Sequence, residues 1–245
     1  MKIGVFGDIH GNLAALEATL AAMREEGCFR YLCTGDIVGY GPSPHECLQK
    51  IRELGPACLT VLGNHDEYVT EIFGSGVAKL EPDTRRMIEW THNQLNMDEL
   101  TWLAALPGTR QAEGATLLHG SLGGHHWNYI VNLQELERHF ARQTSHLAFC
   151  GHSHLPLAGL QAPGHPLKLD FLKEMTLPPE GKVLINPGAV GQPRDRDARA
   201  AFVVWNKATG EIQPCRVPYD IEATQKLMTA ASLPERFITR LSVGR

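Results

Sequence analysis

The sequence has no long apolar run, no paired-cysteine motif and no excess of basic residues. No stretch approaches the ~20 apolar residues that a membrane-spanning helix requires, so we expect no such helix. The first residues become polar too quickly for a secretory signal, which favours a cytoplasmic location. A net charge of −4 at pH 7 argues against stable nucleic-acid binding, which usually requires a basic excess. It does not exclude a nucleotide substrate, because bound metal ions would add local positive charge.

The six cysteines contain no CxxC pair. Cys33, Cys58 and Cys150 lie within apolar runs, where cysteine usually serves as a small core residue. A chain of 245 residues can bury a sufficient core without disulfides. We therefore expect free cysteines in a reducing environment and no disulfide framework.

The first third of the chain alternates between apolar runs and helical patterns. Residues 3–6, 31–34 and 58–62 are typical of buried strands. A helix is predicted from Asn12, with Gly27 as its stop, and a second helix from the Ser43–Pro44 pair. This βαβαβ order predicts a parallel sheet with helices on its outside.

The remainder is predicted to be helical at first and then rich in strands. Residues 64–105 are mostly helical, with one helix starting at Pro82 and another capped by Asp98. Further predicted elements are strands at 116–118, 147–150, 183–185, 201–205 and 212–217, helices at 133–142 and 221–231, and a turn at 208–210. The Pro- and Gly-rich segment 159–181 is expected to be an exposed loop. The pattern predicts one domain over residues 1–245, in which two mixed sheets are flanked by helices.

Oxygen and nitrogen ligands recur in a fixed order, each close behind an apolar run. These residues are Asp8, His10, Asp36, Asn64, His119, His152 and His154. In open α/β sheets the carboxyl ends of the strands converge on one edge, where ligands bind. Five loops can therefore present these side chains to one point. Asp8 and His10 would project the same way if the backbone between them is extended, as would His152 and His154.

The composition of this set narrows the chemistry. It contains no thiolate, and carboxylate and imidazole ligands together suit Mn, Fe, Zn, Co or Ni, of which we favour Mn. Two ions ~3.5–4 Å apart can clamp both the attacking and the leaving oxygen of a phosphoryl transfer. The sequence therefore predicts a two-metal site in a hydrolase that acts on a phosphate ester.

The order DxH, GD, GNHD, H, GHxH resembles that of the calcineurin-like metallophosphoesterase superfamily. The resemblance extends from Asp8 to the Asn186-Pro187-Gly188 segment. Residues 35–42 and 186–195 resemble the small bacterial and archaeal members related to the YfcE-type phosphodiesterases. The resemblance implies an α/β fold, a four-layer α/β/β/α sandwich of two mixed sheets, with two divalent or trivalent transition-metal ions.

The resemblance also implies a role for each site residue. Asp36 would bridge the two ions, and a hydroxide between the ions would attack phosphorus in line. His65 would stabilise the transition state or protonate the leaving oxygen, and Asp66 would orient His65 through a hydrogen bond. One ion would take Asp8, His10 and His154, and the other Asn64, His119 and His152.

Three features leave the substrate open. Tyr40 can stack on a base, bond a phosphate or simply pack. Arg194 can bind a phosphate or form a salt bridge with Asp195 or Asp197. The loop with His125, His126 and Trp127 replaces the Pro-Arg-Asp-Pro of related proteins, and it either contacts substrate or has no role.

We expect a small phosphate ester or nucleotide as substrate, in particular a phosphodiester or nucleotide polyphosphate. The alternatives are a small-molecule phosphomonoesterase, a nuclease with weak activity on short single strands, and a non-catalytic scaffold. Retention of His65 and all the ligands argues against a scaffold. The apolar residues Phe237, Ile238 and Leu241 would pack on the body or on a second subunit, which leaves a homo-oligomer open.

Overall fold

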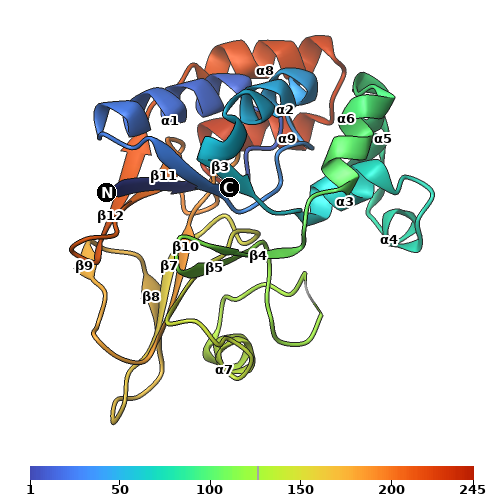
Figure 1. The fold of residues 1–245 in the computed structure, drawn as a ribbon. Helices are drawn as coiled ribbons and strands as arrows, with labels where there is room; N and C mark the ends of the chain where they lie inside the picture. The colour runs from blue at the N-terminus through green and yellow to red at the C-terminus, as the bar shows by residue number, and fades with distance from the viewer. Residues whose placement is uncertain (126) are drawn as a thin grey trace.

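Two six-stranded mixed sheets pack against each other, and helices cover both outer faces (Figure 1). The structure is a computed structural model that describes residues 1–125 and 127–245. Helix α7 covers one sheet, whereas α1, α2, α8 and α9 lie on the opposite side of the molecule over the other sheet. The α/β/β/α sandwich expected from the sequence is therefore confirmed.

The first sheet contains the predicted βαβαβ unit. Its strands, in spatial order, are β3 (Cys58–Thr60), β2 (Arg30–Cys33), β1 (Lys2–Phe6), β11 (Ala200–Asn206), β12 (Glu211–Val217) and β9 (Met175–Thr176). The first three are parallel and the others antiparallel. Val5 in the centre pairs with Leu32 on one side and Val203 on the other. Because helices and the second sheet cover both faces, these strands are nearly uninterrupted apolar runs.

The second sheet corrects one expectation. Its strands, in spatial order, are β4 (Thr109–Ala112), β5 (Ala115–Leu118), β6 (Leu147–Phe149), β10 (Lys182–Pro187), β7 (Pro156–Gln161) and β8 (Lys168–Phe171). The loop expected at 159–181 is wrong in part: the segment is largely exposed, but the end of β7, all of β8 and all of β9 lie within it. Strand β7 pairs with β10 over its full length, and the Pro and Gly residues that suggested a loop lie mainly in the turns around these strands.

The helices begin close to the predicted residues. They are α1 (Leu13–Glu25), α2 (Pro44–Glu53), α3 (Asn64–Thr70), α4 (Ser75–Ala78), α5 (Pro82–Gln94), α6 (Met97–Ala104), α7 (Leu133–Phe140), α8 (Ile221–Ala230) and α9 (Glu235–Thr239), with 3₁₀ turns at Gly55–Ala57 and Arg240–Ser242. Asn12 caps α1 as predicted, accepting a hydrogen bond from the amide of Ala15. The predicted cap of α6 is wrong: Asn96, not Asp98, forms a capping box with Glu99. None of the helices in the described ranges is long and apolar enough to cross a membrane.

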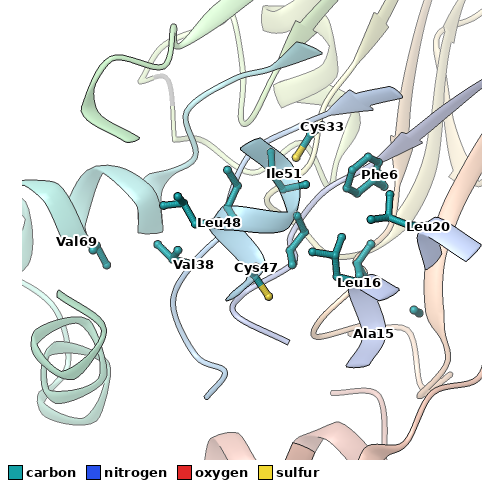
Figure 2. Packing of buried hydrophobic residues seen from close by; sticks show 14 of the residues in the cluster. Phe6, Ala15, Leu16, Leu20, Cys33, Val38, Cys47, Leu48, Ile51 and Val69 are labelled. Carbon is teal, nitrogen blue, oxygen red and sulfur yellow. The ribbon is translucent and has the colours of Figure 1, made fainter. Parts of the chain in front are cut away.

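Three apolar clusters fill the spaces between the layers. The largest joins the first sheet to its helices, and Figure 2 shows Leu16 and Leu20 of α1 gathered with Leu48 of α2 and Phe6 of β1. A second cluster fills the space between the sheets, and a third lies between the second sheet and α7. Each fully buried Leu or Phe contributes roughly 1.5–3 kcal/mol to folding. The cysteines are free, as expected.

The C-terminal apolar residues pack on the body of the chain. Phe237, Ile238 and Leu241 are buried in the largest cluster. The amide of Arg196 also donates a hydrogen bond to the carbonyl of Gly244. The last helical segment is thereby fixed beside the loop that follows β10.

A buried histidine in α7 should make stability depend on pH. Burial lowers the pKa of His139 to about 4, so the folded protein resists a proton that the unfolded chain binds near pH 6.5. We expect this side chain alone to reduce the free energy of unfolding by about 2 kcal/mol between pH 7.5 and pH 5. Urea unfolding at both pH values should show a loss of stability that is smaller by about this amount in His139→Gln than in wild type. The exposed turn residue His165 supplies the control, since His165→Gln should keep the wild-type dependence. Equal dependence in all three proteins would contradict the prediction.

Candidate metal centre

The predicted ligands meet where parallel strands of both sheets end. Asp8 and His10 follow β1, Asp36 follows β2, Asn64 begins α3 after β3, His119 follows β5, and His152 and His154 follow β6. All seven side chains are buried, with at most 6% exposed. The convergence expected from the sequence is therefore present across two sheets and not at the edge of one.

The potential ligand atoms form two groups that share one carboxylate. Asp8, His10, Asp36 and His154 make up one group, and Asp36, His119 and His152 make up the other. Within each group the atoms lie within 4.8 Å of one another. Oδ2 of Asp36 is 3.5 Å from Nε2 of His10 and 3.3 Å from Nε2 of His119.

Asn64 lies at the second group. Its Oδ1 is 3.0 Å from Nε2 of His119. The amide oxygen therefore lies beside the second group.

Backbone carbonyls set the orientation of all four histidines. A carbonyl only accepts hydrogen bonds, so the ring nitrogen facing it carries the proton and the other nitrogen is free for a metal. Nδ1 faces a carbonyl in three of them and Nε2 in the fourth: His10 to Val38 at 3.2 Å, His119 to Thr34 at 2.7 Å, His154 to Gln192 at 2.6 Å and His152 to Trp127 at 2.9 Å. Burial also lowers the pKa of His152 to about 3 and lowers the pKa values of His10 and His154. The neutral form of these three rings, which binds metals, is therefore favoured.

Two buried nitrogen lone pairs point at each other with no proton between them. Nε2 of His10 and Nε2 of His154 are 3.0 Å apart, although both protons are already assigned to Nδ1. Within the described part of the chain, Oδ2 of Asp36 has no hydrogen-bond partner, while its Oδ1 accepts from the amide of His65 at 2.8 Å. Buried lone pairs that face one another are unfavourable unless a cation lies between them. The donor set therefore fits metal ions.

The pKa shifts within the cluster also indicate that it accommodates additional positive charge. Burial, and after it the neighbouring Asp36, raises the pKa of Asp8 to about 7. Burial acts to lower the pKa of His119, but the adjacent Asp36 outweighs it and raises the value to about 9. The cluster thus needs positive charge, which a proton on His119 supplies in part and metal ions would supply in full.

The ligand loops adopt a backbone conformation that the sequence did not suggest. Five ligands have positive φ values: Asp8 at 49°, His10 at 52°, Asp36 at 54°, His152 at 68° and His154 at 58°. The extended backbone that was the condition for each pair to project the same way is therefore not present, because these turns are left-handed. Such residues cost roughly 1–3 kcal/mol each and persist where surrounding contacts hold them. Here the amides of residues 9 and 10 donate to the carbonyl of Asp36, and the amide of His152 donates to the carboxylate of Asp8.

Gly63 lies so close to Asp36 that a side chain does not fit. A Cβ atom at this position would be 2.1 Å from Oδ1 and 2.3 Å from the amide nitrogen of Asp36. We expect Gly63→Ala to displace the shared carboxylate, and to lower bound metal and hydrolytic rate by at least about 10-fold. Metal analysis of the purified variant and an activity assay would measure both.

Gly108 offers a matched control. A Cβ atom there meets nothing within 4 Å, so Gly108→Ala should retain wild-type metal content and rate. Full metal content in Gly63→Ala would contradict the prediction, because it would show that the loop shifts to accommodate the methyl group without displacing Asp36.

His65 lies beside the first group, and Asp66 does not bind it as expected. The His65 ring is 4.8 Å from that of His10, measured between centroids, and its Nδ1 has no hydrogen-bond partner among the described residues. Asp66 instead accepts from the amides of Gly63, Ile37 and Val38. The expected hydrogen bond between His65 and Asp66 is therefore absent: Asp66 caps the start of α3 and holds the loop that carries Asp36.

Tyr40 and Arg194 both border the centre. The Tyr40 ring packs 4.7 Å from His10 and 4.5 Å from His65, between centroids. Neither predicted salt-bridge partner of Arg194 is used, because Asp195 pairs with Arg216 and Asp197 with Arg199. The amide of Arg194 donates to the carbonyl of His154 at 3.3 Å.

The loop at 125–127 contributes to the support of the centre. His126 lies outside the described residues. The carbonyl of Trp127 accepts from His152, and its indole nitrogen donates to Glu67 at 2.8 Å. Sequence reasoning did not identify this backbone role, nor the stacking of Tyr129 on His152 at 4.0 Å and 9°. A carbonyl contributes no side-chain signal, and Tyr129 belongs to no motif.

Asn186 supports the loop that carries His152 and His154. Its amide donates to the carbonyl of Gly151 at 2.6 Å and to the hydroxyl of Ser153 at 3.0 Å. This residue opens the segment that resembled a family motif in the sequence. In the structure, this motif residue therefore holds the loop of His152 and His154 in place.

A family model matches most of the chain and thereby identifies its family. The model described as the calcineurin-like phosphoesterase superfamily domain matches residues 1–209. The chain belongs to this superfamily. It is a phosphoester hydrolase, and members of the superfamily depend on metal ions, in agreement with the donor set.

Two relatives are similar over nearly the whole chain. Protein MJ0912 of Methanocaldococcus jannaschii is 34% identical over 251 residues, which cover 99% of this chain and 98% of that protein. The crystal structure of a metallophosphoesterase from Sphaerobacter thermophilus is 36% identical, with a TM-score of 0.85 and coverage of 100% and 99%. The metallophosphoesterase fold is therefore shared from end to end.

A further relative matches over part of its length. The symmetrical bis(5'-nucleosyl)-tetraphosphatase of Methylococcus capsulatus is 35% identical over 125 residues, which are 50% of this chain and 44% of that enzyme. This chain thus covers less than half of that enzyme.

Proposed function

We propose that this phosphoesterase is a dinuclear-metal enzyme that hydrolyses phosphodiesters or nucleotide polyphosphates. The observation that carries the proposal is the sharing of Asp36 by two groups of buried ligand atoms. A single carboxylate whose free oxygen faces histidines on both sides is suited to bridge two ions. Mn²⁺ is the ion that we favour, and Fe, Zn, Ni and Co suit the same donors.

The two groups support the ligand allocation that the resemblance implies. Asp8, His10 and His154 would hold one ion and Asn64, His119 and His152 the other, with Asp36 between them. When bound, the ions would neutralise phosphate charge and lower the pKa of water. The carbonyls that face the histidines would leave a nitrogen lone pair on each ring free for an ion.

His65 is proposed to act on the phosphoryl group as a neutral hydrogen-bond donor. Burial lowers its pKa to about 4, so the ring is uncharged near neutral pH and carries one N–H. A neutral donor can stabilise charge that develops on the phosphoryl or leaving oxygen. Of the two roles implied by the resemblance, this favours stabilisation of the transition state.

Two observations support a nucleotide polyphosphate. The partial similarity to a tetraphosphatase indicates that this reaction centre is compatible with such substrates. The Tyr40 ring beside His10 and His65 provides an aromatic face at the centre on which a base can stack. Arg194 adds a positive charge there.

A substrate panel tests the proposal. Protein stripped of metal with EDTA and reloaded with Mn²⁺ should hydrolyse bis-p-nitrophenyl phosphate and a dinucleoside tetraphosphate, and the stripped protein should not. Preference for p-nitrophenyl phosphate would indicate a monoesterase instead. No turnover of any ester, with both ions shown to be bound, would contradict the proposal and favour a partner-binding role.

A further inference from the structure

Two arginines from distant parts of the chain converge on one buried amide. Arg194 follows β10, whereas Arg240 follows α9 and lies beyond the residues that the family model matches. A terminal nitrogen of each guanidinium is 3.3 Å from the side-chain oxygen of Gln192. Since both contact the same oxygen, these two nitrogens are at most twice that distance apart.

Among the described residues, neither arginine forms an ion pair with a carboxylate at salt-bridge distance. The neighbouring arginines do: Arg216 pairs with Asp195, Arg199 with Asp197, and Arg236 with Glu81 and Asp83. Burial, and after it the charge of Arg194, lowers the pKa of Arg240. Its Nε is buried and has no hydrogen-bond partner in the described part of the chain. Two adjacent cations, one with an unused buried donor, are a favourable environment for an anion.

The pair is firmly connected to the metal centre. The carbonyl of Gln192 accepts from Nδ1 of His154 at 2.6 Å, and the amide of Arg194 donates to the carbonyl of His154. On the other side, Arg240 lies 5.3 Å from the ring centre of Phe237, which packs 4.8 Å from Tyr40. Tyr40 in turn contacts His10. Contacts with two predicted metal ligands therefore hold the two arginines beside the centre.

We propose that Arg194 and Arg240, joined by Gln192, form a second phosphate site that binds a non-reacting phosphate of the substrate. The inference rests on the proposed function, because the reacting phosphate is taken to lie at the ligand cluster. The arginines would recognise a chain of two or more phosphates and leave single-phosphate esters without this contact. The class of substrate is then a polyphosphate ester, and residues outside the family match contribute to this choice.

Equilibrium binding tests the site without turnover. The probes are bismethylene triphosphate, whose P–C–P bonds resist hydrolysis, and methylphosphonate, which has one anionic group. Isothermal titration calorimetry on Mn²⁺-loaded protein would compare wild type with Arg240→Gln and Arg240→Lys. We expect Arg240→Gln to weaken the triphosphate analogue by at least about 10-fold, to weaken methylphosphonate much less, and Arg240→Lys to recover part of the loss.

Arg236 supplies the matched control. It lies over the same Phe237 ring at 4.7 Å but is neutralised by Glu81 and Asp83, so Arg236→Gln should bind both probes as wild type does. Equal weakening of both probes by Arg240→Gln, or no weakening of either, would overturn the second site. If Arg240→Gln folds poorly, Arg194→Gln gives the same comparison.

The binding experiment and the hydrolysis assay test separate claims, so either claim can fail without the other. Hydrolysis of bis-p-nitrophenyl phosphate with no effect of Arg240 on the triphosphate analogue would leave the proposed function standing and remove the second site. Selective loss of triphosphate binding in a protein that hydrolyses no ester would do the reverse, and would leave a polyphosphate-binding site without the proposed reaction.

Discussion

Replacing Asp36 by Asn should lower kcat/KM for bis-p-nitrophenyl phosphate by at least about 1000-fold. Asp36 is the member common to both ligand groups, and its Oδ2 faces His10 and His119 with no hydrogen-bond partner in the described structure. Asparagine has the same shape but lacks the charge, and its NH₂ group would repel a cation if it replaced Oδ2. We therefore expect loss of one or both ions together with the rate.

Metal analysis and a matched variant make this result specific. Asp98 is exposed on α6 and pairs with Arg52, so Asp98→Asn should keep wild-type rate and metal content. A contaminating phosphatase would be equally active in both preparations. If Asp36→Asn retained more than a tenth of the activity, the carboxylate would not bridge two ions that are required for turnover.

Replacing His65 by Asn should reduce kcat by about 100- to 10,000-fold while leaving the metal content unchanged. His65 is buried beside His10, and its Nδ1 has no partner among the described residues. It belongs to neither ligand group. A side chain in this position is free to act on the substrate, and its removal should spare the ions.

The contrast with the Asp36 variant is the informative measurement. Asp36→Asn should lose metal and rate together, whereas His65→Asn should lose rate alone. The exposed His165 again provides a control, since His165→Asn should be fully active. Loss of metal from His65→Asn would assign His65 to the ligand set, and unchanged kcat would remove it from the mechanism.

The sequence by itself determined the parts of this protein that depend on local patterns. The apolar runs and the helical spacing after Asn12 predicted the βαβαβ unit, because strand and helix periodicity are properties of short segments. The order of the ligands predicted the convergence of five loops. The side chains do converge, because each follows a parallel strand, but these strands belong to two sheets and not to one as the rule supposes.

Segment 159–181 shows where local patterns were insufficient. Its Pro and Gly residues indicated a loop, yet it contains the end of β7 and all of β8, because β10 pairs with β7 and β7 pairs with β8. Strand pairing is a contact between distant segments, and it overrides weak local preference. The capping of α6 by Asn96 instead of Asp98 is a smaller error of two residues in a boundary.

Only the tertiary structure decided how the site is supported. Contacts between loops on different strands produce the left-handed turns at Asp8 and Asp36. Such contacts also orient the histidines through backbone carbonyls and make Asp66 a helix cap. The meeting of Arg194 with Arg240 likewise requires α9 to fold back over the loop after β10. The sequence shows which side chains are candidate ligands. Their protonation, their backbone conformation and the charges around them depend on groups that are distant along the chain and become neighbours only after folding.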